Sequence, residues 1–203
     1  GLQLWTLWQS RLFAPQWLER LTLARITVVI WIATAVLAGL AAARLTGTPI
    51  FPSGDEPHYL VIAQSLWRDG DLKIENNHTR GDYREYFYRD LEPHYLTRGA
   101  DSEIYSIHPV GLAVMMAPVY GVGGYQAVVL VLILMGATAA AIAWWWTMGV
   151  VNTAGAATFS WVAIAGSAPF LFNTFTVYPE IAAALAVMIA LVTTVRTSQA
   201  KAG

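Results

Sequence analysis

The chain has 203 residues, of which 56% are hydrophobic and only 12% are charged. Soluble globular domains carry about 25% charged residues, so this composition excludes an ordinary soluble domain and indicates a membrane protein. Cysteine is absent, which excludes disulfide bonds and thiolate metal sites.

The charged residues are concentrated in one segment. Eleven of the 13 acidic residues and six of the 12 basic residues lie between Asp55 and Glu103, and no charged residue occurs from Pro109 to Pro179. Acidic residues outnumber basic ones in this segment, whereas proteins that bind nucleic acids show a basic surface. The sequence therefore predicts one polar module within an apolar chain and no nucleic-acid partner.

The first elements are an arm and a membrane span. Residues 1–25 are rich in Trp and Leu and carry a few charges, a pattern typical of an amphipathic segment in the membrane interface. We expect Pro15 to break this arm into two short helices. The 18 residues from Ile26 to Ala43 lack charge and reach the length of a transmembrane helix, so 26–45 is the first predicted span.

The polar module is predicted over residues 46–124, followed by three more spans. The stretch from Pro109 to Gly121 is only 13 residues, or about 20 Å as a helix, which is short of the ~30 Å hydrocarbon core. We expect 109–121 to form a re-entrant or interfacial helix. The remaining spans and the tail are predicted at 125–147, 153–172, 177–195 and 196–203.

This pattern predicts an all-α polytopic membrane protein with about four transmembrane helices and an outward-facing loop module that contains short helices. Four spans place both termini on one side. The flanking basic residues favour the cytoplasm for both ends, which puts residues 46–124 outside a membrane such as the bacterial inner membrane. These basic residues are Arg11, Arg20, Arg25, Arg196 and Lys201.

Two acidic positions in this arrangement could carry chemistry. Ser53 and Glu56 have the spacing of a capping box, so Asp55 lies at the start of a predicted helix, close to the exit of the first span. A carboxylate fixed there could be a general base or a metal ligand, and it could equally be a simple helix cap. Glu180 opens the last span and would lie on the same side of the membrane; an ionisable residue there indicates a functional site or a solvated helix end.

The pentapeptide Glu-Pro-His-Tyr-Leu occurs twice, at Glu56–Leu60 and at Glu92–Leu96. The first copy continues into residues with helical spacing, whereas the second is followed by Thr97-Arg98-Gly99 and has no helical period. Little else aligns between the two copies, so we interpret the second copy as loop structure and not as a repeat unit.

The order of these motifs resembles the GT-C superfamily of polytopic glycosyltransferases, especially the protein O-mannosyltransferase and lipid A aminoarabinose transferase type. The matching segments are SGDEPHYLVIAQSLWRDGDL, EIYSIHPVGLAVMMAPVYGVGG and FNTFTVYPEIAAAL. The resemblance implies sugar transfer from a polyprenyl-phosphate carrier to an acceptor hydroxyl on the outer face.

The resemblance also implies roles for individual residues. Asp55 would match the catalytic base, while Glu56 and Glu180 would place the acceptor or a divalent cation. The resemblance establishes no cofactor; a divalent cation, if one is bound, would take its ligands from these three carboxylates. The residues expected to bind the substrate are His58, His108, Tyr105, Arg44 and Arg84.

Three kinds of function stay open. Complete members of the superfamily have more helices, so the chain would be part of a lipid-dependent sugar transferase or a non-catalytic subunit that packs with other membrane subunits. The Trp-rich arm and a stretch of small residues in the second span would suit such packing; the small residues are Gly136, Ala137, Ala139, Ala140 and Ala141. A transporter or channel is less favoured, because the spans contain almost no ionisable residues.

Overall fold

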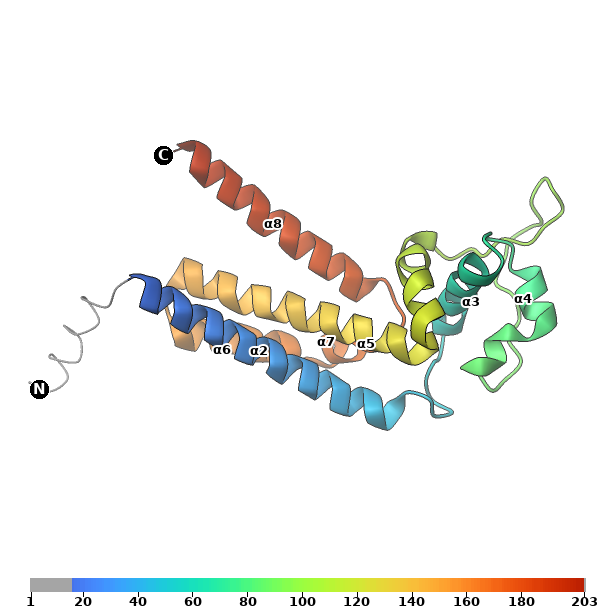
Figure 1. Cartoon of the computed structure of the whole chain (residues 1–203), viewed down its shortest axis with the longest axis horizontal. Helices are drawn as coiled ribbons and strands as arrows, with labels where there is room; N and C mark the ends of the chain where they lie inside the picture. The colour runs from blue at the N-terminus through green and yellow to red at the C-terminus, as the bar shows by residue number, and fades with distance from the viewer. Residues whose placement is uncertain (1–15, 203) are drawn as a thin grey trace, which may run out of the picture.

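The computed structural model describes the backbone of residues 16–202 and the side chains of residues 22–201. Within these ranges the chain is all-helical, apart from isolated β-bridges (Figure 1). The elements are α2 (Gln16–Leu45), α3 (Glu56–Arg68), α4 (Glu75–Arg80), the 3-10 helix η1 (Asp82–Glu85), α5 (Val110–Val151), α6 (Ala154–Ala165), α7 (Ala168–Asn173) and α8 (Glu180–Ala202).

Three helices of the described part are, by length and composition, long and apolar enough to cross a membrane, as expected of an integral membrane protein. They are Thr22–Leu45 in α2, Val110–Val151 in α5 and Glu180–Lys201 in α8. The predicted arm 1–25 lies mostly outside the described residues, including the expected break at Pro15. From Gln16 onward α2 is one helix, so the boundary expected between 25 and 26 is not a break.

Helix α2 packs on α5 through one face. Ile30, Thr34, Ala38 and Ala42 recur every four residues and are buried, so they form a single stripe along the helix. Two indole N–H groups connect the helices at this level: Trp31 donates to Thr138 on α5 at 3.0 Å, and Trp161 on α6 donates to Thr34 at 2.8 Å.

The segment expected to form one span at 153–172 is divided into two helices. Helix α6 ends before Gly166 and Ser167, and α7 begins with Pro169 in its first turn. Proline lacks the N–H that would continue the hydrogen-bond ladder, which explains the break. Helix α6 has 12 residues, or about 18 Å, and is an apolar helix shorter than a span. Three helices of spanning length therefore replace the predicted four.

Helix α5 is interrupted at two consecutive glycines. Gly123 has φ −150° and ψ 20°, and Gly124 has φ 62° and ψ −154°, a conformation that is essentially restricted to glycine. The short segment before this break crosses the long segment at an angle and packs on α3 (Figure 1). The expected short helix 109–121 ends at Gly121, just before this break at Gly123 and Gly124.

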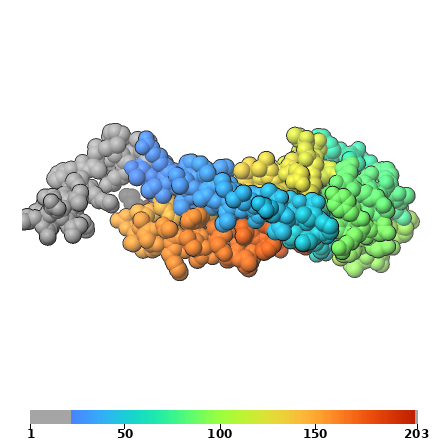
Figure 2. Space-filling model, turned by 90° about the horizontal axis from the view of Figure 1, so that it is seen from below, coloured from blue at the N-terminus to red at the C-terminus, as the bar shows by residue number. Residues whose placement is uncertain are grey.

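The polar module sits at one end of an elongated molecule (Figure 2). Helix α3 is its central element, and ten consecutive residues from Glu56 to Ser65 are buried. The connector between α7 and α8 returns to the same end, where Phe175 and Val177 are buried. Phe51, just before α3, packs edge-on against Phe175 with ring centroids 5.9 Å apart. The module and the end of the bundle therefore share one core.

Candidate functional site

The loop that carries Asp55 is held by Tyr178 from the connector between α7 and α8. The Tyr178 hydroxyl accepts a hydrogen bond from the Asp55 backbone N–H at 3.1 Å and donates to the Ser53 carbonyl at 3.3 Å. Gly54 has φ +58°, and a Cβ there would lie 2.5 Å from the Tyr178 hydroxyl oxygen. Glycine is therefore required for this approach, which leaves the Asp55 side chain half exposed (50%) at the start of α3.

Glu56, by contrast, is completely buried (0% exposed). Its Oε1 accepts a hydrogen bond from Ser53 N–H at 2.9 Å, and its Oε2 accepts one from Val177 N–H at 2.7 Å. The first contact is one half of the predicted capping box. Burial raises the pKa of Glu56 to about 7, although both backbone donors act in the opposite direction. Glu56 therefore links the polar module to the connector between α7 and α8, at the end of the bundle.

Glu180 is exposed and is the first residue of α8. Burial raises the pKa of Tyr59, and the negative charges of Glu180 and Asp55 raise it further. Both carboxylates therefore act on the same ring. Tyr178 packs edge-on against Tyr59, with ring centroids 6.3 Å apart. The structure thus brings Asp55 and Glu180 to the same end of the bundle, around two tyrosines.

Beside Asp55 lie three histidines from three distant parts of the chain. His58 is on α3, His94 is in the second pentapeptide copy, and His108 precedes α5. The rings of His58 and His94 stack with centroids 3.7 Å apart, and His94 Nδ1 lies 3.2 Å from His108 Nε2. The carboxylate of Asp55 lies 3.9 Å from His94 Nδ1. The two pentapeptide copies therefore meet in space through their histidines.

Burial favours the neutral form of His58 and of His108. It lowers the pKa of His58 to about 3, and the neighbouring His94 and His108 lower it further through charge repulsion. Burial also lowers the pKa of His108, against the opposing effect of the Asp55 carboxylate. One ring nitrogen from each of the three histidines lies within 4.8 Å of the others. A neutral imidazole offers a free lone pair, so the cluster can accept protons or bind a metal ion.

Sequence reasoning included His58 and His108 but missed His94, which was interpreted as loop structure. Its surroundings are indeed irregular, and the Ile107 N–H donates to the His94 carbonyl at 3.0 Å. Only the tertiary fold brings this loop over α3. The shared pentapeptide was the one signal in the sequence. A comparison of the helical spacing around its two copies could not show that their histidines meet in space.

The other residues expected to bind substrate lie elsewhere in the described part of the chain. Arg84 pairs with Asp90 at 2.8 Å, and the Tyr105 hydroxyl donates to Asp101 at 2.6 Å. Arg44 is exposed in the last turn of α2. None of the contacts described for Arg84 or Tyr105 involves Asp55 or the three histidines.

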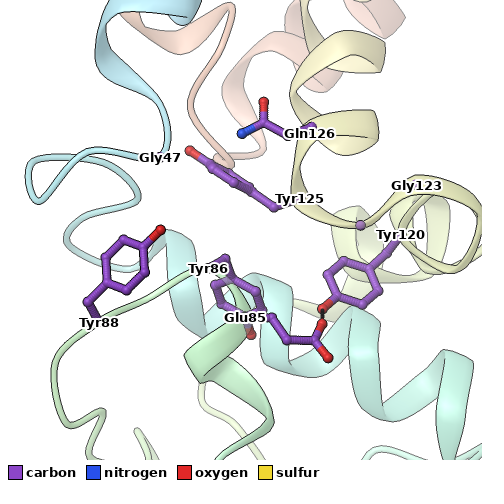
Figure 3. A pocket seen from close by; sticks show the side chains of 9 residues that line it. Gly47, Glu85, Tyr86, Tyr88, Tyr120, Gly123, Tyr125 and Gln126 are labelled. Carbon is purple, nitrogen blue, oxygen red and sulfur yellow. Dashed lines mark hydrogen bonds between the residues drawn. The ribbon is translucent and has the colours of Figure 1, made fainter.

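A separate cavity of about 190 Å³ lies where α5 is interrupted (Figure 3). The Tyr120 hydroxyl donates to Glu85 at 2.6 Å on one side of it, and the Tyr125 hydroxyl is buried without a hydrogen-bond partner among the described residues. Sequence reasoning did not predict this cavity, because its lining comes from four separate segments. The lining residues are Gly47, Glu85, Tyr86, Tyr88, Tyr120, Gly123, Gly124, Tyr125 and Gln126.

Comparisons with protein-family models, with curated proteins and with solved structures find no match for this chain. Its function must therefore be argued from the chemistry of its residues. The strongest arrangement for that purpose is Asp55 with the neighbouring histidines and Glu180.

Proposed function

We propose that this chain provides the acceptor site of a membrane glycosyltransferase that uses a polyprenyl-phosphate-linked sugar, with Asp55 as general base. The observation that carries the proposal is the placement of Asp55. Its carboxylate is half exposed (50%), at a helix N-terminus, where the polar module meets the hydrophobic bundle. A lipid-linked donor needs a reactive centre at such a junction, and deprotonation of a hydroxyl needs a positioned carboxylate.

The proposed step moves the sugar from the phosphate of the donor to the oxygen of the acceptor. An oxygen of Asp55 takes the proton of the acceptor hydroxyl while the hydroxyl oxygen forms a bond to the anomeric carbon. The bond between that carbon and the phosphate oxygen breaks, and the polyprenyl phosphate leaves with the electron pair. Glu180, on the same side of the bundle, would orient the acceptor.

Charge distribution supports an outward-facing module. The start of α2 and the end of α8 both point away from the module, toward the other end of the molecule (Figure 1). Arg25 lies in α2 and Arg196 in α8, and the Arg196 guanidinium lies 4.3 Å from the centre of the Trp145 ring. Basic residues near span ends favour the cytoplasmic side. The module would then face outward, as in the bacterial inner membrane arrangement expected from the sequence.

The alternative of a packing subunit receives less support. One of its two arguments was the stretch of small residues in α5, which would suit contact with another helix; the other, the Trp-rich arm, lies mostly outside the described residues. These residues are buried within the chain itself, and a Cβ on Gly136 would lie 2.5 Å from Cγ2 of the buried Thr174. The stretch therefore serves the packing of this bundle and offers no surface to a partner.

Asp55→Asn tests the proposal directly. In membranes supplied with a panel of labelled polyprenyl-phosphate sugars, wild type should transfer label to an acceptor. Asp55→Asn should lower the rate by about 10²–10⁴-fold, the usual contribution of a general base. The matched control is Asp90→Asn, because Asp90 is an exposed carboxylate paired with Arg84, and this variant should retain activity. Undiminished transfer by Asp55→Asn would overturn the role as base.

A further inference from the structure

We propose that His58, His94 and His108 bind one divalent transition-metal ion, with Zn²⁺ the best-suited ion, next to Asp55. The geometry points to an ion site because one nitrogen from each ring lies within 4.8 Å of the others. This proposal concerns ion binding and does not depend on the sugar transfer proposed above. It names histidine nitrogens as the metal ligands, where the sequence had suggested carboxylates.

The spacing of the nitrogens fits an ion. Zinc binds imidazole nitrogen at about 2.0–2.1 Å, and two ligands of a tetrahedral ion are then roughly 3.3 Å apart. His94 Nδ1 and His108 Nε2 are separated by 3.2 Å, close to this spacing. His58 is fixed on the buried face of α3 (4% exposed), while the His94 side chain is 45% exposed. His94 can therefore adjust its ring to complete the set around the fixed His58.

The ligand chemistry selects the kind of ion. Imidazole suits zinc, copper, iron and nickel, whereas magnesium and calcium prefer carboxylate, carbonyl and water oxygens. A site for one of these harder ions would need several free carboxylates, but both oxygens of Glu56 already accept backbone hydrogen bonds. Three histidines with an open fourth position are also the ligand pattern of catalytic zinc sites.

Asp55 adds a negative charge beside the cluster. Its carboxylate is 3.9 Å from His94 Nδ1 and acts electrostatically on His108. At this distance it would offset part of the charge of the ion and face a water or hydroxyl in the fourth position. We therefore treat Asp55 as a neighbour of the ion and the three histidines as its ligands.

Zinc binding to the whole chain tests the proposal. The protein would be purified in detergent with a tag that contains no histidine, stripped with a chelator and titrated with Zn²⁺ by calorimetry. Elemental analysis would give the stoichiometry, which should be one ion per chain. Replacement of Zn²⁺ by Co²⁺ should give the visible absorption of a nitrogen-ligated, four-coordinate site.

His94→Ala and His108→Ala should each weaken Zn²⁺ binding by more than about 100-fold, because even residues that only support a ligand are worth 10–100-fold. His94 is exposed, so its variant should keep the fold. The matched control is His78→Ala: His78 lies outside the cluster and contacts the Leu91 carbonyl, and its variant should bind one ion with unchanged affinity. Asp55→Asn should keep the stoichiometry with weaker binding.

Less than one ion per wild-type chain, or equal affinity in wild type and His94→Ala, would overturn the metal site. The outcome is separable from that of the sugar-transfer proposal. Zinc binding that persists in Asp55→Asn, together with undiminished transfer by that variant, would leave the ion site standing and remove Asp55 as base. Transfer that depends on Asp55 in a protein without stoichiometric zinc would support Asp55 as base and overturn the ion site.

Discussion

Glu56→Gln tests whether the buried carboxyl links the polar module to the bundle. Glu56 accepts one hydrogen bond from Ser53 N–H at 2.9 Å and one from Val177 N–H at 2.7 Å. A protonated carboxyl still offers a lone pair on each oxygen, whereas the amide nitrogen of glutamine offers none. One buried N–H would therefore lose its acceptor, which costs about 1–3 kcal/mol of unfolding free energy.

The assay is thermal unfolding of the purified chain in detergent at pH 4. This pH is below both the ordinary pKa of a glutamate, 4.5, and the raised pKa of Glu56, about 7, so the carboxyl is mostly neutral in the folded and in the unfolded chain, and the wild type and the variant differ mainly in hydrogen bonding. For a chain of this size the loss corresponds to a fall in Tm of roughly 2–12 °C.

Glu92→Gln is the matched control. It makes the same change in the second copy of the pentapeptide, where the glutamate is exposed. An exposed substitution should change the unfolding free energy by no more than about 0.5 kcal/mol. Equal Tm values for the Glu56 and Glu92 variants would refute the link between the module and the bundle.

Two further variants test other features. Gly124→Ala should lower the unfolding free energy by about 1–3 kcal/mol, because Gly124 adopts a conformation restricted to glycine. The control is Gly39→Ala, which lies in open space on α2 and should be neutral or stabilising in the same thermal assay. Equal effects of the two variants would argue against the break in α5. Burial lowers the pKa of His78 below its ordinary value of 6.5, so the folded state binds this proton less readily than the unfolded state, and stability should fall as pH drops through 6.5. His78→Asn keeps a side-chain donor for the Leu91 carbonyl and should lose less stability in this acidic range; identical pH profiles of unfolding would contradict this cause.

Much of the architecture follows from local sequence patterns. The charge-free stretches predicted long apolar helices, and the glycines at 121–124 lie where α5 is interrupted. The division of the predicted third span was less evident, because hydropathy is continuous across it. Pro169 and Gly166 divide this span, since proline cannot continue a helix and glycine weakens it.

The candidate site depends more on tertiary structure. Asp55 and Glu180 were predicted on one side of the membrane from span counting, and the structure places both at the module end of the bundle. Two other features could not be predicted from local patterns. The irregular loop that carries His94 folds back over α3, and Glu56 is turned inward, where it accepts a hydrogen bond from the Val177 N–H. Neither long-range contact leaves a helical period in the sequence, and the shared pentapeptide was the one signal for the first of them.

An outward-facing Asp55 is the central requirement of the proposed function, and cysteine labelling measures it most directly. The chain contains no cysteine, so a single cysteine can be placed at Leu96, which is 86% exposed on the module, or at Thr197 near the end of α8. A membrane-impermeant maleimide applied to intact cells should label Leu96→Cys and should reach Thr197→Cys only after permeabilisation. Labelling of Leu96→Cys only after permeabilisation would place Asp55 in the cytoplasm and contradict the proposed function.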